Sequence, residues 1–260
     1  TLFLDEVAEL SLPVQLRLSL LLMLTVGVWD GLLIRLVITG RLENRWPEAI
    51  SPVTSLADRL RGGLVGLLVG DALGVPYEFH QPNDIPPRSE IEFEPPPYFR
   101  RSHDTVLPGS WSDDGAQALA LLASLNHCGK LDVDDFGRRL VNWYESGYMA
   151  VDSEVFDVGV QTSQAIRRLM AGVPTAQAGR TDEQANGNGS LMRVLPLALW
   201  HKGSDTELVR DAQRQSIVTH GHLRSQVCCA LYCLWARRYL EDSKSPWSEA
   251  VLRLREIYAE

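Results

Sequence analysis

The regular apolar patterns of this chain all repeat at the spacing of an α-helix. Leu64, Leu67 and Leu68 would share one helical face, and Phe136 and Leu140 another. No run of alternating β-branched residues marks a half-buried strand. The sequence therefore predicts an all-α fold of many helices, and it shows no internal repeat.

Capping signals mark where several of these helices begin. Ser55 and Ser204 each stand three residues before an acidic residue, Asp58 or Glu207, which is the pattern of a capping box. Pro246 suits the first position of the final helix. Further helices are predicted over residues 132–144, 163–171 and 223–240.

Length, charge and cysteine content limit the class of protein. With 260 residues, 45% of them hydrophobic, the chain is long enough for one sizeable globular domain with a small appendage. A net charge of −8 without a stripe of Lys or Arg argues against nucleic-acid binding. Four cysteines without the spacing of a disulfide framework or a zinc site favour a reducing, cytoplasmic setting.

We divide the chain into an N-terminal helical extension of unknown role, residues 1–53, and a main domain, residues 54–260. Asp30 and Arg35 interrupt the apolar stretch 18–38, and the uninterrupted core that remains is too short to span a membrane. Because the chain does not begin with Met and stops inside a predicted helix, we expect it to be part of a longer product.

A proline-rich segment separates the first helix of the main domain from the next. Residues 75–110 contain eight prolines, so they cannot form a regular helix or a central strand. A loop of this length is typically a functional lid or a disordered segment. Glu78 lies near its start, seven residues after Asp71, so the two carboxylates could share one mouth.

Two adjacent carboxylates, Asp113 and Asp114, precede a strongly apolar helical run. They fall on the first turn of that helix, where free N–H groups and the helix dipole favour negative charge. Carboxylate oxygens of this kind suit Mg²⁺, Mn²⁺ or Ca²⁺. The structural alternative is an ordinary helix cap, with Ser112 or Asp113 at the N-cap position.

A glycine-rich loop made of Gly187, Asn188, Gly189 and Ser190 precedes the next apolar segment. Such a loop at the start of a helix can present several backbone N–H groups to a phosphate. Arg193 would add a fork of donors to the same anion. A plain Asn-Gly turn is the structural alternative.

Two single polar residues also stand at the ends of predicted helices. Asp71 ends an apolar stripe, where it needs a cation or several hydrogen-bond donors. His220, in a Thr-His pair, is either a substrate contact or a hydrogen-bonded structural residue.

Taken together, these stretches resemble the ADP-ribosylglycohydrolase family. Each motif is weak alone, but five in the family's order are specific, and they cover roughly residues 55 to 240. The matching pieces are Gly70 to Gly74 with Glu78, Trp111 to Asp114, Asp157 to Thr162, Gly187 to Arg193, and Thr219 with His220.

The resemblance implies an orthogonal all-α bundle with a dinuclear Mg²⁺ (or Mn²⁺) centre in a cleft. It implies removal of ADP-ribose from a modified protein side chain, or cleavage of a related small ADP-ribosyl compound. By similarity Ser112, Asp113 and Asp114 would be metal ligands. Asp113 would also be catalytic, and Glu78 would lie on the loop that gates the site and act in proton transfer.

The resemblance also implies a set of substrate contacts. Asp71 would contact the substrate or orient the site, and His220 would line the ADP-ribose cleft. The backbone of the glycine-rich loop would hold the diphosphate, with Arg193 beside it. The contacts expected from that loop are Gly187, Asn188, Gly189 and Ser190.

Two departures from the family pattern leave alternatives open. Gly115 replaces the second threonine of the usual Thr-Asp-Asp-Thr, and no Asp-x-Asp-Thr motif follows His222, where Asp242 stands alone. The alternatives are therefore a hydrolase without its C-terminal part, an inactive ADP-ribose-binding or structural homologue, and a broken product without activity. The modified residue or metabolite, and the oligomeric state, stay open.

Overall fold

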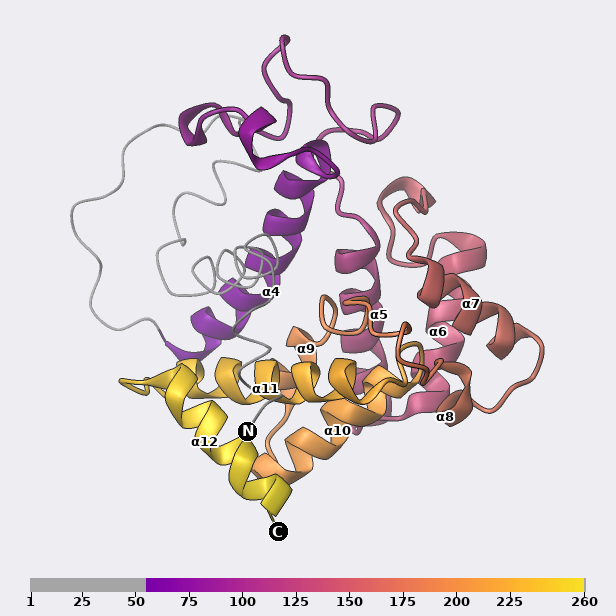
Figure 1. Ribbon diagram of the computed structural model, residues 1–260, viewed down its shortest axis with the longest axis vertical. Coiled ribbons are helices and arrows are strands. Elements are labelled where there is room, and N and C mark those ends of the chain that lie inside the picture. Colours follow the sequence, from indigo (N-terminus) through magenta and orange to yellow (C-terminus); the bar gives the residue numbers. More distant parts are fainter. Residues whose placement is uncertain (1–54, 260) are drawn as a thin grey trace.

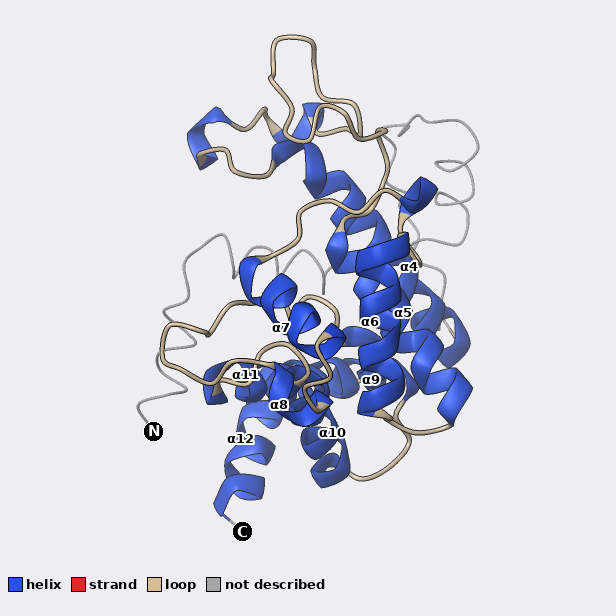
Figure 2. Ribbon diagram, turned by 90° about the vertical axis from the view of Figure 1, so that its right-hand side faces the viewer, coloured by secondary structure: helices blue, strands red, loops and turns tan. Residues whose placement is uncertain are grey.

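The computed structural model describes residues 55–259, which form helices and loops without a strand (Figure 2). The predicted all-α fold is confirmed. The helices are α4 (Leu56–Gly74), α5 (Asp113–Cys128), α6 (Val133–Ser146), α7 (Val160–Met170), α8 (Thr175–Ala178), α9 (Leu195–Trp200), α10 (Asp205–Ile217), α11 (Leu223–Leu240) and α12 (Pro246–Ala259).

Helix α11 packs against several of the other described helices. It runs across the lower end of the steeper α4 (Figure 1), and it contacts α9, α10 and α12 as well as α4. Its Cys229, Ala230, Cys233 and Leu234 are fully buried in the common core. The thiols are free and buried, as expected for structural cysteines in a chain without a disulfide framework.

The predicted helix starts agree with the observed caps. Ser55 forms a capping box with Asp58, and Ser204 forms one with Glu207. One boundary was wrong: α7 begins at Val160 rather than at residue 163, because Gly159 has the extended backbone of an N-cap residue.

The glycine-rich loop does not lead directly into a helix, contrary to our prediction. The backbone N–H groups of Leu191 and Met192 both donate to the carbonyl of Asn188, at 2.7 and 3.2 Å. This closes a turn, and α9 starts only at Leu195, where Pro196 suits the first turn of a helix.

The proline-rich segment 75–110 contains only short 3₁₀ turns and is closed on itself at its neck. The N–H of Ser102 donates to the carbonyl of Pro76 over 2.8 Å. The Tyr77 hydroxyl bonds the backbone of Glu92, and its ring packs on Phe99 at 5.2 Å between centroids. These contacts favour the lid alternative over a disordered segment.

The predicted extension, residues 1–53, lies outside the described residues, and so does the apolar stretch 18–38. Within residues 55–259 no helix is both long and apolar enough to cross a membrane.

Candidate active site

Asp71, near the end of α4, caps the N-terminus of α5. Its carboxylate accepts hydrogen bonds from the Ser112 N–H (3.0 Å), the Ser112 hydroxyl (2.8 Å) and the Gly115 N–H (2.7 Å). Burial raises the pKa of Asp71 to about 7, although the three hydrogen bonds act in the opposite direction. Asp71 thus finds the donors that the sequence required, and it lies behind Ser112 rather than on the pocket wall.

Ser112 is the N-cap of α5, so the capping alternative is correct in its geometry. Its side chain accepts a hydrogen bond from the Asp114 N–H over 3.3 Å while donating to Asp71. This pairing fixes the first turn of α5 and directs both following carboxylates. Asp113 and Asp114 line a pocket, whereas Ser112 does not.

Asp113 is only 4% exposed, and its negative charge is unfavourable there because of burial and neighbouring carboxylates. Its carboxylate accepts one hydrogen bond from the Gln117 side-chain amide, over 3.0 Å. Burial raises the pKa of Asp113 well above its usual range, and the charges of Asp114 and Asp157 raise it further. A cation near these carboxylates would offset that charge.

Packing explains why a glycine replaces the family's second threonine. A Cβ atom on Gly115 would lie 2.8 Å from Cβ and Cγ of Trp111 and 2.9 Å from Cδ2 of Leu68. Trp111 is itself fixed by a hydrogen bond from its indole N–H to the Met149 carbonyl, at 2.9 Å. The space that a threonine side chain would need is therefore filled by Trp111.

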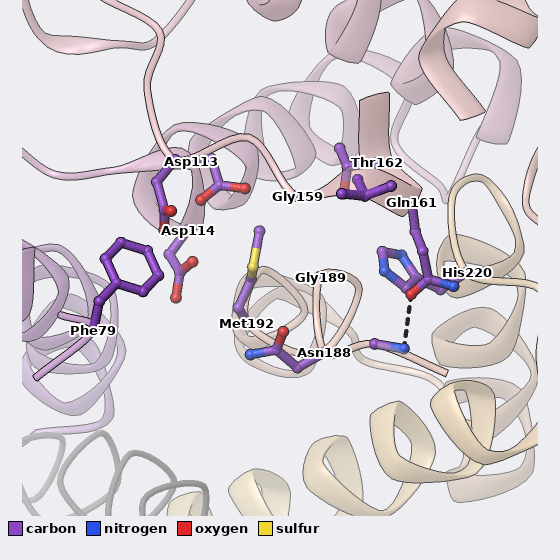
Figure 3. Close-up of a pocket in the computed structure, with 13 residues that line it drawn as sticks. Phe79, Asp113, Asp114, Gly159, Gln161, Thr162, Asn188, Gly189, Met192 and His220 are labelled. Atoms are coloured by element: carbon purple, nitrogen blue, oxygen red, sulfur yellow. Dashed lines mark hydrogen bonds between the residues drawn. The ribbon is translucent and has the colours of Figure 1, made fainter. Parts of the chain in front are cut away.

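One pocket of about 350 Å³ unites the sequence motifs (Figure 3). Asp113 and Asp114 lie beside Phe79 at one end, and His220 lies with Gln161 at the other. The lining residues are Phe79, Asp113, Asp114, Asp157, Gly159, Val160, Gln161, Thr162, Gly187, Asn188, Gly189, Met192 and His220.

The glycine-rich loop is pinned against α7 and His220. The N–H of Gly187 donates to the side-chain oxygen of Gln161 over 2.8 Å. A Cβ atom on Gly189 would come within 2.6 Å of Cε1 of His220 and 3.0 Å of the Thr162 hydroxyl. Glycine is required here because three separate motifs meet without room for a side chain.

Among the described residues, no group accepts a hydrogen bond from the backbone N–H groups of Asn188 and Gly189. Ser190 belongs to the core below, where its hydroxyl lies 2.8 Å from that of Ser216. Asn188 and Gly189 line the pocket, so the loop backbone is the part of this motif that can offer donors to a ligand.

His220 is 2% exposed and lines the pocket with one edge. Its Nδ1 lies 2.8 Å from the Thr219 hydroxyl, which fixes the orientation of the ring. Burial lowers the pKa of His220 to about 3, and the charge of Arg193 lowers it further, so the ring is neutral at pH 7. It is thus both a hydrogen-bonded buried residue and part of the pocket wall.

The structure places Arg193 away from the pocket, so the predicted diphosphate contact has no support in the geometry. Its side chain is fully buried, with the guanidinium 5.0 Å above the Phe136 ring. Its donors reach the side-chain oxygens of Gln117 (2.8 Å) and Gln215 (3.2 Å) and the Gln215 carbonyl (3.2 Å). Arg193 lies beneath the pocket floor.

Sequence reasoning missed a cluster at the rim, beside the acidic end. Oxygens of Glu78 and Asp157 and a ring nitrogen of His103 all lie within 4.8 Å of one another, close enough to share a metal ion. The His103–Glu78 hydrogen bond is 3.0 Å long. This set differs from the predicted ligands of α5. Of its members, His103 carried no sequence signal, because it lies in the proline-rich segment.

Comparison with known proteins shows the family. Residues 52–260 match the ADP-ribosylglycohydrolase family, and this chain belongs to it. It is 32% identical over 220 residues to an ADP-ribosylarginine hydrolase of Pseudomonas putida, covering 82% of this chain and 56% of that protein. It is 34% identical over 184 residues to the ADP-ribosyl-[dinitrogen reductase] glycohydrolase of Rhodospirillum rubrum, covering 67% and 55%.

A solved structure agrees with the fold. The chain described as an ADP-ribosylglycohydrolase-related protein complex superposes with a TM-score of 0.57 at 31% identity, over 78% of this chain and 62% of that one. By their names, these two curated relatives are ADP-ribosyl hydrolases. The chain spans about half the length of the curated relatives it matches.

Proposed function

We propose that the protein to which this chain belongs is a Mg²⁺-dependent hydrolase that cleaves the glycosidic bond between ADP-ribose and a protein side chain. The observation that carries this proposal is the pocket itself. It joins the carboxylates of Asp113 and Asp114 to the backbone donors of Asn188 and Gly189 within one cavity. The acidic end would take the terminal ribose of ADP-ribose, and the loop end would take its diphosphate.

The residues at the acidic end fit a divalent cation. Asp113 and Asp114 offer hard oxygen donors on the pocket wall, and Ser112 stands behind them with a hydroxyl oxygen. The buried carboxylate of Asp113 gains most from a bound cation, because its neighbours are also acidic. These residues would hold Mg²⁺ (or Mn²⁺), and such an ion would polarise the ribose hydroxyls and water.

The chain's own groups orient the substrate for cleavage. The N–H groups of Asn188 and Gly189 bind the diphosphate, for which donors matter more than net positive charge. Neutral His220 closes the opposite wall and Asp71 fixes the first turn of α5. Glu78, held by His103, exchanges a proton at its carboxylate with the attacking water or the leaving group.

A second candidate function is ADP-ribose binding without cleavage. It is favoured by one observation, which is that Gly115 carries no side-chain oxygen at the position of the second threonine of the family's Thr-Asp-Asp-Thr motif. The pocket carboxylates would then hold a cation and a ligand without completing a dinuclear centre.

Calorimetric titration with ADP-ribose, in Mg²⁺ and again in EDTA, tests the proposal. We expect micromolar binding that weakens without metal, and we expect Asp113→Asn to remove the metal dependence. Asp134→Asn is a matched control, because Asp134 is exposed on α6. Equal affinity in both buffers would favour a metal-independent binding module. Release of ADP-ribose from an ADP-ribosylated protein then separates cleavage from binding.

A further inference from the structure

A second group of metal-ligating side chains lies at the rim of the pocket, apart from the carboxylates of α5. An oxygen of Glu78, an oxygen of Asp157 and a ring nitrogen of His103 all lie within 4.8 Å of one another. Glu78 and His103 stand near the two ends of the proline-rich segment, and Asp157 lies in the loop before α7. All three side chains are partly buried. We call Glu78, His103 and Asp157 the rim cluster.

The neck of the proline-rich segment brings Glu78 and His103 together. The N–H of Ser102 donates to the carbonyl of Pro76 over 2.8 Å, and its hydroxyl donates to the carbonyl of Glu78. Nε2 of His103 lies 3.0 Å from a carboxylate oxygen of Glu78, and the two side chains are only 17% and 11% exposed. Backbone contacts therefore place these two ligands side by side.

Two aromatic rings fix the imidazole of His103. Its ring centroid lies 5.7 Å from that of Phe79 and 5.1 Å from that of Phe156. Because Asp157 directly follows Phe156, the second ring contact also holds the backbone that carries the third ligand. A set of ligands that is held in place before binding loses less conformational entropy when a metal ion binds.

The donor set of the rim cluster is typical of zinc. One imidazole nitrogen with two carboxylate oxygens matches the ligand types of zinc sites, in which water often takes the fourth position. Magnesium prefers oxygen ligands alone, such as those of Asp113 and Asp114. Ligands of one zinc ion lie about 3–4 Å apart, because each is about 2.0–2.2 Å from the metal, so a movement of roughly 1 Å closes the cluster around an ion.

The charge around the rim cluster also favours a cation. Asp157 lines the pocket together with Asp113 and Asp114, and none of the described lining residues is Lys or Arg. A divalent ion in the cluster is therefore neutralised by two carboxylates and attracted by the two of α5.

We propose that the rim cluster is a zinc site, separate from the magnesium site expected on α5. Glu78, His103 and Asp157 supply three ligands, and water supplies the fourth. The ion joins the base of the proline-rich segment to the loop before α7, so it holds the mouth of the pocket together. Binding of zinc does not depend on the proposed function.

Calorimetric titration with Zn²⁺ tests the proposal on the whole 260-residue chain, freed of metal with EDTA and then dialysed. We expect one ion per chain. His103→Asn removes the imidazole, and we expect it to weaken the complex about 100-fold, since even the loss of a residue that supports a ligand weakens metal binding 10–100-fold. His127→Asn is the matched control, because His127 is exposed on α5. Equal affinity in His103→Asn and the wild type would overturn the site.

The same titration in excess Mg²⁺ separates the rim cluster from the carboxylates of α5. Because Mg²⁺ competes poorly for a site that contains imidazole, we expect the affinity for Zn²⁺ to stay unchanged. Displacement of zinc by Mg²⁺ would assign the zinc to Asp113 and Asp114 and overturn the proposal.

Cobalt shows directly whether residue 103 is a ligand. In His103→Cys a thiolate replaces the imidazole, and thiolate ligation of Co²⁺ produces an intense charge-transfer band in the near ultraviolet. We expect this band in His103→Cys and not in the wild type. Its absence from the variant would overturn the site, and this readout does not depend on a comparison of stabilities.

Zinc should also raise the melting temperature of the wild type and of His127→Asn, because the cluster exists only in the folded chain. It should leave that of His103→Asn unchanged, and an equal rise in His103→Asn would contradict the proposal. ADP-ribose binding is measured separately, so loss of the zinc site and failure of the proposed function are distinguishable.

Discussion

Arg193 donates a hydrogen bond to the side-chain oxygen of Gln117 over 2.8 Å, and both residues are fully buried. The amide nitrogen of Gln117 then donates to Asp113 over 3.0 Å. On its other side Arg193 bonds Gln215, whose amide nitrogen donates to the Ser190 carbonyl over 3.1 Å. One buried polar chain therefore runs beneath the pocket, from the acidic end to the glycine-rich loop.

Removing the Gln117 amide should unfold the protein more easily and misplace Asp113. In Gln117→Leu the guanidinium of Arg193 loses an acceptor inside the core, at a cost of about 2 kcal/mol or more. Urea denaturation measures this as a lower free energy of unfolding. Asn126→Leu is the matched control, because it replaces an exposed amide on the same helix. Equal stability of Gln117→Leu and the wild type would show that the buried hydrogen bonds of Arg193 do not stabilise the fold.

Restoring the family's threonine should not restore a metal ligand. Gly115→Thr forces a Cβ atom against Trp111, and overpacking of this kind costs about 1–3 kcal/mol. We expect a lower melting temperature and no gain in Mg²⁺ affinity by calorimetry. Gly74→Ala is the control, since a Cβ at Gly74 meets nothing within 4 Å. A tighter Mg²⁺ complex in Gly115→Thr would show that Trp111 can move aside.

Adding one methyl group to the glycine-rich loop should weaken ADP-ribose binding. In Gly189→Ala the new Cβ contacts His220 and Thr162, so the loop must move. A displacement worth roughly 1.4 kcal/mol corresponds to about a tenfold loss of affinity. Calorimetric titration with ADP-ribose measures it, with Gly74→Ala again as the control. Unchanged affinity in Gly189→Ala would mean that this loop does not hold the ligand.

Asp135 should make stability depend on pH in the acid range. Burial raises the pKa of its carboxylate, but the hydrogen bonds from Arg139 and Arg138 outweigh burial and lower the pKa to about 2, from 3.8. The folded state therefore binds the proton less tightly than the unfolded chain. The stabilisation is complete above pH 4 and is lost as the pH falls towards 2.

The matching variant is Asp135→Asn. A shift of this size corresponds to at most about 2 kcal/mol at pH 7, and the side chain is only 11% exposed. We expect the difference from the wild type in urea denaturation to be present at pH 7 and to vanish near pH 2. Asp134→Asn, at an exposed position, should show no such trend. A difference that is constant between pH 7 and pH 2 would exclude this ion pair as its origin.

Local sequence signals predicted the helices well because those signals act locally. The capping boxes at Ser55 and Ser204 and the 223–240 helix are where the sequence placed them. The prediction that the glycine-rich loop opens a helix was wrong, because the Asn188 carbonyl takes the N–H groups of the next residues. Competition of that kind is not visible in a helical periodicity.

Site residues that belong to recognisable motifs could be predicted from the sequence. Residues whose place at the site depends on tertiary packing could not. Asp113, Asp114 and His220 line the pocket, as expected from their motifs, while their roles remain predictions. Arg193 was assigned to the pocket because an arginine near a glycine-rich loop suggests an anion, yet its acceptors come from α5 and α10. His103 lies 25 residues from Glu78 in sequence, and only tertiary structure brings them together.

The hydrogen bonds that close segment 75–110 hold its two ends together independently of the residues between them, 79–101, which we call the tip. Because Ser102 is tied to Pro76 next to Glu78, the tip can lengthen, shorten or change sequence without shifting the carboxylate at the pocket mouth. Insertions should therefore be tolerated between Glu78 and Ser102, where they leave the pocket mouth in place.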